Sequence, residues 1–246
     1  MLNWNKLPRH IEPTIGQHNE ETYCCVCNMH WPTTSKPYTQ FFVLSYEQPQ
    51  DIGACPRCQA SGRHRLMHYA KEHSLFNWSE KNILYISPES QYEKYLVKFL
   101  KSSNTVKCSN INPKHRPDVV YDITDIDCAS DTYDVVFAIH VLEHIESDIR
   151  AFDELTRVLK PQGKLVVSVP QSQNPTTFQS PDVNTRELRM KHYLWEDHVR
   201  LYGRDFSDRY LKPRYARIET LDASTNPTWM KQQRLLDSDV LHICTK

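Results

Sequence analysis

Glycine is scarce in this sequence: there are 5 glycines among 246 residues, and none lies between Gly62 and Gly163. Glycine alone tolerates left-handed backbone and the close approach of a ligand to the main chain, so this stretch lacks an ordinary glycine-rich nucleotide loop. Long apolar runs are missing too. None approaches the roughly 20 residues of a membrane span, and the polar start MLNWNKLPRH contains no signal-peptide core. We therefore expect a cytoplasmic protein with no membrane partner.

A charge excess is also absent, because Lys+Arg and Asp+Glu each number 30. Zero formal net charge disfavours nucleic acid as a partner without excluding it, and a protein partner stays open. A chain of 246 residues can bury a substantial core, and this length suits one α/β domain with an appendage.

The 8 cysteines are unevenly distributed. Two CxxC pairs, Cys24 to Cys27 and Cys55 to Cys58, lie within residues 23–62, and Cys25 is a spare thiol beside the first pair. Each pair places two thiolates on one tight turn, and two such turns form the closed tetrahedral site that Zn²⁺ prefers. The sequence therefore predicts a four-cysteine zinc ribbon with a structural metal; a redox pair is the alternative. Residues 1–22 form a polar N-terminal arm.

The stretch from Tyr133 to Pro170 predicts a strand, a helix and a second strand. A continuous apolar run over 135–139 is typical of a buried parallel strand, and apolar residues then recur at helical spacing from 147 to 160. A second apolar strand follows at 165–169. Further strands are expected at 82–87, 105–110 and 118–121, with a terminal antiparallel pair at 217–223 and 239–244. This pattern predicts an α/β fold.

The same stretch resembles the motif IV to motif V region of class I S-adenosylmethionine-dependent methyltransferases, in YDVV, LEH and RVLKPQG. The CPRC and RHR runs, together with DHVRLYGRDF at 197–206, resemble the subset of methyltransferase type 11-like enzymes that carries an N-terminal zinc ribbon. This resemblance implies a Rossmann-like sheet, of parallel strands plus a terminal antiparallel strand. It also implies a linker helix at 63–80, a methyltransferase domain at 81–246 and a lid insertion at about 170–203.

The resemblance implies S-adenosylmethionine as the cofactor, bound by residues that follow the ends of the strands. ISPE, which ends at Glu89, resembles the cofactor loop of the ribbon-bearing subset, and Asn110 stands where an acidic residue usually accepts the ribose hydroxyls. Asp122 falls in a DITD turn that resembles the adenine-binding turn. The full set of expected cofactor contacts is Ser87, Pro88, Glu89, Asn110, Asp122, Ile123 and His140.

His140 is the candidate general base, because an imidazole at the carboxyl edge of the sheet can take a proton from the acceptor. By letters alone, HVLEH at 140–144 matches the HxxEH of inverted zinc proteases, which the strand context argues against. A metal at His140, Glu143 and His144 stays open by resemblance to ubiquinone-type O-methyltransferases. His198 is a second catalytic candidate, and the expected substrate contacts are His144, His198, Arg200 and Tyr202. Anchoring of the lid is the alternative role for the last three.

The resulting hypothesis is a methyltransferase that acts on a hydroxyl or amine of a glycan or small metabolite. One alternative is a scaffold or binding subunit that kept the fold and lost the cofactor, which the missing glycines and Asn110 favour. A second is an RNA methyltransferase that uses the ribbon to bind RNA. Arg63, His64 and Arg65 either contact an anion, such as the cofactor carboxylate, or form a solvated basic turn.

Overall fold

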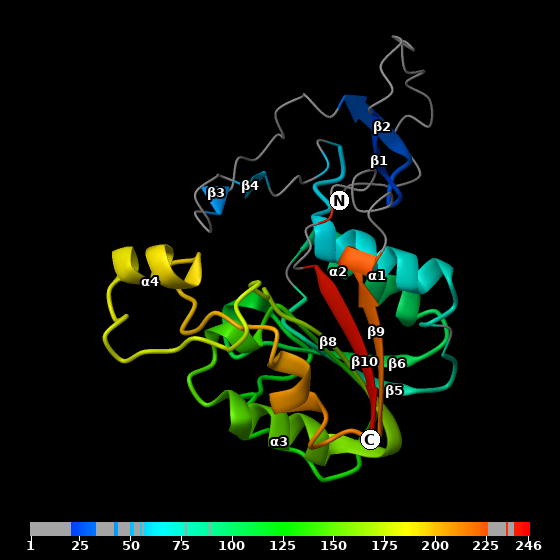
Figure 1. The fold of residues 1–246 in the computed structure, drawn as a ribbon. Helices are drawn as coiled ribbons and strands as arrows, with labels where there is room; N and C mark the ends of the chain where they lie inside the picture. The colour runs from blue at the N-terminus through cyan, green and yellow to red at the C-terminus, as the bar shows by residue number, and fades with distance from the viewer. Residues whose placement is uncertain are drawn as a thin grey trace.

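The computed structural model describes residues 21–32, 42–43, 50–51, 55, 57–76, 78–88, 90–225, 235 and 239–246. Most of these belong to one α/β unit, drawn in Figure 1 below the N-terminal hairpin. Residues 1–20, which make up most of the predicted arm, and Glu89 lie outside the described residues.

The centre of the fold is a 6-stranded sheet in the order β6-β5-β7-β8-β10-β9. Its first four strands run parallel, whereas β10 is antiparallel to both of its neighbours. This confirms the predicted sheet. The strands are β5 (Asn82–Ile86), β6 (Thr105–Ser109), β7 (Tyr133–Ile139), β8 (Leu159–Ser168), β9 (Arg217–Asp222) and β10 (Val240–Thr245).

Two predicted features differ from the structure. The strand expected at 118–121 is reduced to one parallel bridge between Ser109 and Val119. The helix expected over 147–160 ends at Val158, and residues 160–163 lie inside β8, where the register with β7 slips and Gln162 adopts a left-handed φ of 63°. A bulge of this kind lets a strand absorb extra residues without ending, which explains why the proline and glycine there do not terminate it.

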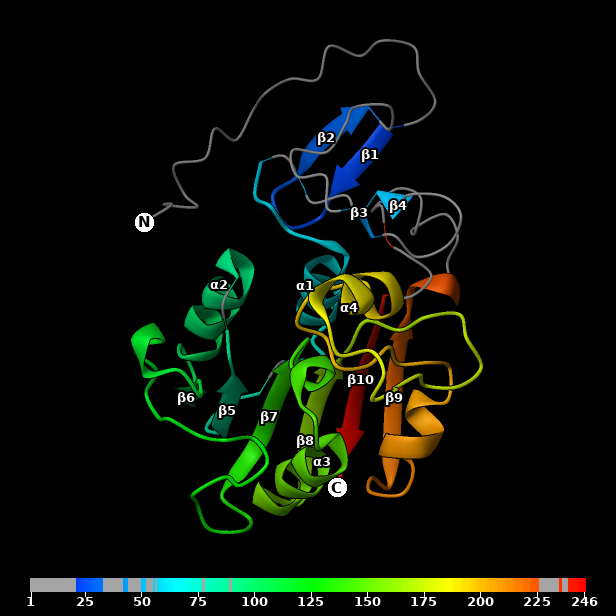
Figure 2. The same cartoon turned by 90° about the vertical axis from the view of Figure 1, so that its left-hand side faces the viewer.

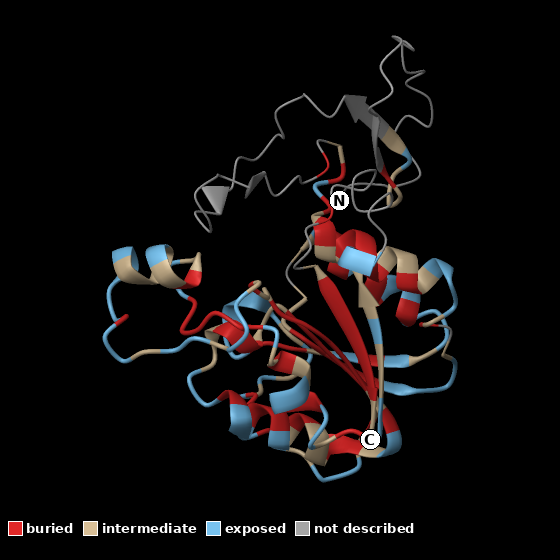
Figure 3. Cartoon of the chain, viewed as in Figure 1, coloured by how far each residue is buried: buried red, intermediate tan, exposed pale blue. Residues whose placement is uncertain are grey.

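Helices cover both faces of the sheet (Figures 1 and 2). On one face, α1 (Gly62–Glu72) and α2 (Gln91–Leu100) pack on a core cluster that contains Tyr85 and Phe137. On the other, α3 (Asp148–Val158) packs Phe152 and Leu155 against the alternate side chains of the strands. The central strands are accordingly buried over most of their length, as Figure 3 shows in red for β7, β8 and β10, whereas the edge strands β6 and β9 are partly exposed.

Local sequence explains where α2 begins. Ser90 is its N-cap, and its hydroxyl accepts a hydrogen bond from the Glu93 N–H at 3.0 Å. The Glu93 carboxylate returns the contact by accepting from the Ser90 N–H at 3.0 Å. Such a capping box satisfies two backbone donors that the first turn of a helix leaves unpaired, so the chain turns directly from β5 into α2 without a glycine.

The segment after β8 forms a small ordered unit beside the sheet. It contains α4 (Arg186–Tyr193) and a cluster of Val183, Tyr193 and Leu201. Isolated bridges join Gln171 to Tyr202 and Phe178 to Leu201, so the segment leaves the sheet and returns to nearly the same place. The described part of 170–203 therefore has its own apolar contacts.

The N-terminal elements are short. A hairpin pairs β1 (Glu21–Cys24) with β2 (Met29–Pro32), and β3 (Phe42–Val43) pairs with β4 (Gln50–Asp51). Among the described residues, no helix has the length and apolarity to cross a bilayer.

Candidate functional site

Two residues other than glycine adopt left-handed backbone at the carboxyl ends of adjacent strands. Ser87 follows β5 with a φ of 48°, and His140 follows β7 with a φ of 51°. Their backbone N–H groups donate to Ser109 O at 2.7 Å and to Ser168 O at 2.9 Å, respectively. This conformation costs a residue with a side chain roughly 1–2 kcal/mol. Strain of this kind at the edge where α/β sheets bind ligands indicates a functional site.

Asn110 lies at the same edge, beyond β6. It is buried, and its Oδ1 accepts a hydrogen bond from the Asn112 N–H at 2.8 Å. Its own N–H donates to Val119 O at 3.3 Å. The amide oxygen expected to accept a ribose hydroxyl is thus fixed in position by its own loop.

Asp122 and Ile123 follow the bridge at Val119. Asp122 is exposed, and its Oδ1 accepts from the hydroxyl of Thr124 at 2.7 Å and from the Thr124 N–H at 2.8 Å. The bonds from the Thr124 side chain and backbone lower the pKa of Asp122, which is therefore a carboxylate at neutral pH. Ile123 is buried in the core cluster on the α3 side. The turn supplies an anion at its surface and an apolar anchor beneath it.

The loop after β7 holds a buried carboxylate. Glu143, in the short helix η3 (Leu142–His144), is 1% exposed, and neither carboxylate oxygen has a hydrogen-bond partner within the described part of the chain. Its Oε1 lies 3.4 Å from His140 Nδ1 and 4.0 Å from His144 Nε2. Burial raises the pKa of Glu143 to about 8 and lowers the pKa of His140 well below its ordinary value. His140 is therefore a neutral imidazole, able to accept a proton, at neutral pH.

His198 comes from the far end of the 170–203 segment but lies beside this loop. Its ring centroid is 4.9 Å from that of His144, at an interplanar angle of 77°. Its Nδ1 lies 2.9 Å from Tyr193 O, and His144 Nδ1 lies 3.3 Å from Asp197 Oδ1. Burial lowers the pKa of His198 to about 4. The structure thus brings together three of the predicted site histidines, His140, His144 and His198, around Glu143.

Arg200 and Tyr202 bind the loop rather than facing away from it. The Arg200 guanidinium donates to the carbonyls of Leu142, Ile145 and Glu146, and to Gln179 Oε1. The Tyr202 hydroxyl donates to Leu142 O at 3.2 Å and to Asp148 Oδ2 at 3.1 Å. Because these contacts occupy the donors of both side chains, the geometry favours lid anchoring over a substrate contact for this pair.

Comparison with known proteins assigns this chain to a protein family. The family model described as a methyltransferase domain matches residues 43–226, which is more than half of the chain. The chain belongs to the methyltransferase domain family. It is thus an S-adenosylmethionine-dependent methyltransferase, as the sequence motifs predicted. No curated protein sequence matches it.

Solved structures of methyltransferases share the fold. The Galdieria sulphuraria protein assigned as a sarcosine dimethylglycine methyltransferase is 13% identical, and the match covers 74% of this chain and 84% of that chain with a TM-score of 0.50. Phosphoethanolamine N-methyltransferase 2 of Haemonchus contortus, solved with S-adenosyl-L-methionine, is 12% identical over 73% of this chain and 52% of its own, with a TM-score of 0.47. A protein assigned as a methyltransferase, solved in complex with the Haloferax volcanii activator Trm112, is 14% identical over 75% of this chain and 93% of its own, with a TM-score of 0.47.

Tyr85 is a core residue of this methyltransferase. Its ring stacks on Phe137, with centroids 4.9 Å apart and an interplanar angle of 2°, and its hydroxyl donates to Glu93 Oε1 at 3.4 Å. The ring is therefore enclosed by the sheet, α1 and α2. Tyr85 thus contributes to the core of the domain and leaves the left-handed turn at Ser87 intact.

The first turn of α1 contains three basic residues, Arg63, His64 and Arg65, which have different surroundings. Besides burial, which has the largest effect, the charge of Arg63 lowers the pKa of both Glu143 and His140. Its buried Nε has no hydrogen-bond partner within the described ranges. Arg65, in contrast, is fully buried and donates to Ala60 O, and His64 Nδ1 lies 3.1 Å from the Ser61 N–H.

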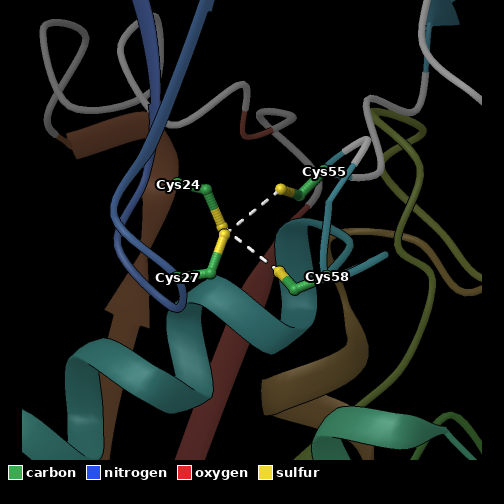
Figure 4. Close-up of side chains that lie close together, drawn as sticks. All are labelled: Cys24, Cys27, Cys55 and Cys58. Atoms are coloured by element: carbon green, nitrogen blue, oxygen red, sulfur yellow. Dashed lines mark hydrogen bonds between the residues drawn. The ribbon is translucent and has the colours of Figure 1, made fainter. Parts of the chain in front are cut away.

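The four cysteines predicted to bind zinc converge ahead of α1 (Figure 4). Cys24 Sγ lies 3.6 Å from Cys58 Sγ, and Cys27 Sγ lies 3.5 Å from Cys55 Sγ. Sulfur ligands about 2.3 Å from a tetrahedral Zn²⁺ stand roughly 3.8 Å apart, so the thiols are close to the spacing such a site needs. The donor set therefore fits zinc. Cys25 Sγ points elsewhere, toward Arg65 O at 3.8 Å.

From the sequence, Glu143 was named only as part of a possible metal site with His140 and His144, and Asp197 was not singled out. The sequence feature that could have indicated Glu143 is its place between two histidines in HVLEH. For Asp197 it is the position directly before His198. Their proximity depends on the return of the 170–203 segment to the sheet edge, where Val199 N–H donates to Glu143 O at 2.9 Å. Spacing along the chain contains no information about that contact.

Proposed function

We propose that this enzyme transfers the methyl group of S-adenosylmethionine to a hydroxyl or amine of a glycan or small metabolite, with His140 as general base. His140 supports the proposal through three properties: its left-handed backbone, its place at the carboxyl end of β7, and a half-buried imidazole whose pKa desolvation keeps well below its ordinary value. A base in that state can take the proton of the acceptor as its oxygen or nitrogen is methylated, which contributes typically ~10²–10⁴ in rate.

The residues proposed to hold the cofactor are those that follow β5, β6 and the parallel bridge at Val119. Ser87 and Pro88 form the turn beyond β5, Asn110 supplies an amide after β6, and Asp122 supplies a carboxylate on the following turn. An amide oxygen and a carboxylate match the hydroxyl and amino groups of an adenosine. Bound S-adenosylmethionine supplies an electrophilic sulfonium methyl. Holding donor and acceptor in line contributes most of the rate, about 7–11 kcal/mol in well-oriented systems.

We also propose that Cys24, Cys27, Cys55 and Cys58 hold a structural Zn²⁺ in a ribbon over residues 23–62, joined through α1 to the methyltransferase domain at 81–246. Four thiolate ligands leave no open coordination position, so this metal would stabilise the fold and take no part in methyl transfer. Cys27→Ser should lose the zinc measured by mass spectrometry in the purified protein, whereas Cys128→Ser, outside the cluster, should retain it.

Two measurements test the enzymatic proposal. Isothermal titration should show binding of S-adenosylmethionine and S-adenosylhomocysteine, and tritium transfer from labelled cofactor to panels of sugars, amines and phenols should identify the acceptor class. His140→Gln should reduce kcat by roughly 10²–10⁴, which is more than the change it causes in cofactor affinity. His73→Gln, which alters an exposed histidine at the end of α1, is the matched control. A well-folded protein that binds neither cofactor form would overturn the proposal in favour of a scaffold.

A further inference from the structure

A second group of metal-ligand side chains lies far along the chain from the cysteines. We propose that Glu143, His144 and His198 form a binding site for a divalent transition-metal ion. One potential ligand atom from each of the three residues lies within 4.8 Å of the other two. Ligand atoms about 2.1 Å from one cation stand roughly 3.0–3.4 Å apart, so from the 4.8 Å limit the group must close by up to roughly 1.4–1.8 Å, which side-chain rotation can supply.

The Glu143 carboxylate requires a partner that the described protein does not provide. It is 1% exposed and both of its oxygens lack a hydrogen bond to any described residue. Burying a polar group without a hydrogen bond is costly, and native proteins seldom leave one unsatisfied without a reason. His140 Nδ1 at 3.4 Å and His144 Nε2 at 4.0 Å are close to Glu143 Oε1 without being hydrogen-bonded to it. A cation bound between Glu143, His144 and His198 would satisfy the carboxylate.

Both imidazoles are oriented as metal-bound histidines usually are. His198 Nδ1 is hydrogen-bonded to Tyr193 O at 2.9 Å, and His144 Nδ1 lies 3.3 Å from the Asp197 carboxylate. A carbonyl or carboxylate on one ring nitrogen fixes the tautomer and leaves the other nitrogen, here Nε2, with its lone pair available. His144 Nε2 lies 4.0 Å from Glu143 Oε1, and the His198 ring, which comes from a different segment, lies 4.9 Å from the His144 ring.

The loop that holds these ligands is rigidly supported. The buried guanidinium of Arg200 binds the carbonyls on either side of Glu143 and His144, and Val199 N–H donates to Glu143 O at 2.9 Å. Side chains with such second-layer support are held close to one geometry, which a metal site requires. This gives a ligand-binding reason for the dense hydrogen bonding of residues 198–202.

Two imidazoles and one carboxylate suit Zn²⁺, Mn²⁺, Fe²⁺ or Co²⁺ better than Mg²⁺ or Ca²⁺, which prefer oxygen ligands. Three protein ligands would leave coordination positions for an outside oxygen. His140 Nδ1 is only 3.4 Å from the Glu143 carboxylate, so an acceptor hydroxyl on such a cation would lie near the proposed base. This use of the metal rests on the proposed function; the site itself does not.

The test is a titration of the purified, zinc-loaded chain with Co²⁺, followed by visible spectroscopy. Co²⁺ on two imidazoles and a carboxylate should give weak d–d bands without the intense near-ultraviolet thiolate bands that exchange into the cysteine cluster would produce. Glu143→Gln and His198→Gln should abolish the weak bands. Asp197→Asn, which alters the carboxylate behind His144, should weaken Co²⁺ binding by roughly 10–100-fold.

Matched controls change the same residue types outside the site. Glu146→Gln alters an exposed carboxylate in the same loop, and His73→Gln alters an exposed histidine, so both should bind Co²⁺ like the parent. The proposal is wrong if Co²⁺ gives only thiolate bands, or if the weak bands survive in folded Glu143→Gln and His198→Gln. Titration with S-adenosylmethionine on the same samples separates this result from the proposed function, since cofactor binding does not require the cation.

Discussion

Arg200 and Asp148 form an ion pair inside the protein. Arg200 Nε lies 3.2 Å from Asp148 Oδ2, and the two side chains are 0% and 9% exposed. Asp148 is the first residue of α3, so the pair joins the end of the 170–203 segment to the helix that follows the site loop. Tyr202 donates to the same carboxylate oxygen at 3.1 Å. The position of Glu143 and its histidines therefore depends on a buried charge pair.

Breaking this pair should be far more costly than breaking an exposed one. Asp148→Asn leaves a buried guanidinium uncompensated, for which we expect a loss of about 3–5 kcal/mol in the free energy of unfolding. The control is Asp153→Asn, which removes the partner of Arg214 at 2.7 Å from a carboxylate that is 62% exposed and should lose no more than about 1 kcal/mol. Urea unfolding measures both. Equal losses would mean that Asp148 is not the essential counter-charge of Arg200.

Gly203 should tolerate no side chain. A Cβ built on it would stand 2.4 Å from the backbone carbon of Thr176 and 2.5 Å from its oxygen, so two backbone segments pass too close for alanine. We expect Gly203→Ala to destabilise the fold by about 1–3 kcal/mol and to shift the 170–203 segment. Gly62→Ala is the comparison, since its Cβ would meet only the end of the Asp239 side chain, which can rotate away. Calorimetry should show a clearly larger fall in Tm for Gly203→Ala.

The parts of the fold that short-range pattern determines were predictable. Apolar runs and the periodicity of 147–160 gave the order of strands and helices, and the paired CxxC turns predicted the cysteine cluster that the structure shows. The functional residues were predictable only as candidates. His198 and Arg200 have similar motif context, yet one turns toward Glu143 and the other binds carbonyls, because tertiary contacts decide side-chain direction. Asn110 likewise gave no sign that its own loop would hold its oxygen.

The scarcity of glycine has a direct consequence at Ser87, whose φ of 48° is one that glycine adopts without strain. Ser87→Gly should relieve roughly 1–2 kcal/mol of strain while adding about 0.5–1 kcal/mol of chain entropy, so stability should be unchanged or slightly raised. Ser102→Gly, in a turn without left-handed backbone, should only lose stability. Ser87→Val should destabilise by more than either and weaken S-adenosylmethionine binding in titration. A Ser87→Gly variant as unstable as Ser87→Val would argue against a left-handed turn at this position.

Buried histidines should make the protein sensitive to acid, and His242 offers the cleanest test. It is 4% exposed in β10, its Nδ1 lies 3.0 Å from Thr220 Oγ1, and burial lowers its pKa to about 4. In the unfolded chain a histidine titrates near pH 6.5. Above that pH His242 is neutral in both the folded and the unfolded chain, and its full contribution to stability is present. As pH falls from 6.5 toward 4, only the unfolded chain binds the proton, so stability is lost, by on the order of 3 kcal/mol at the lower limit.

His242→Gln should remove this share of the pH dependence while keeping a polar contact to Thr220. The free energy of unfolding, measured in urea at pH 7.5 and 4.5, should fall less between the two values in the variant than in the parent. The fall in stability that remains in the variant comes from other histidines such as the partly buried His68, whose pKa is also lowered to about 4 by burial. His73→Gln, at an exposed position, should leave the pH dependence of the free energy of unfolding unchanged. The contrary result is that His242→Gln and His73→Gln both show the pH dependence of the free energy of unfolding that the parent shows. His242 would then have to be accessible to protons in the folded state, and its enclosure between β9, β10 and Gln171 would be wrong.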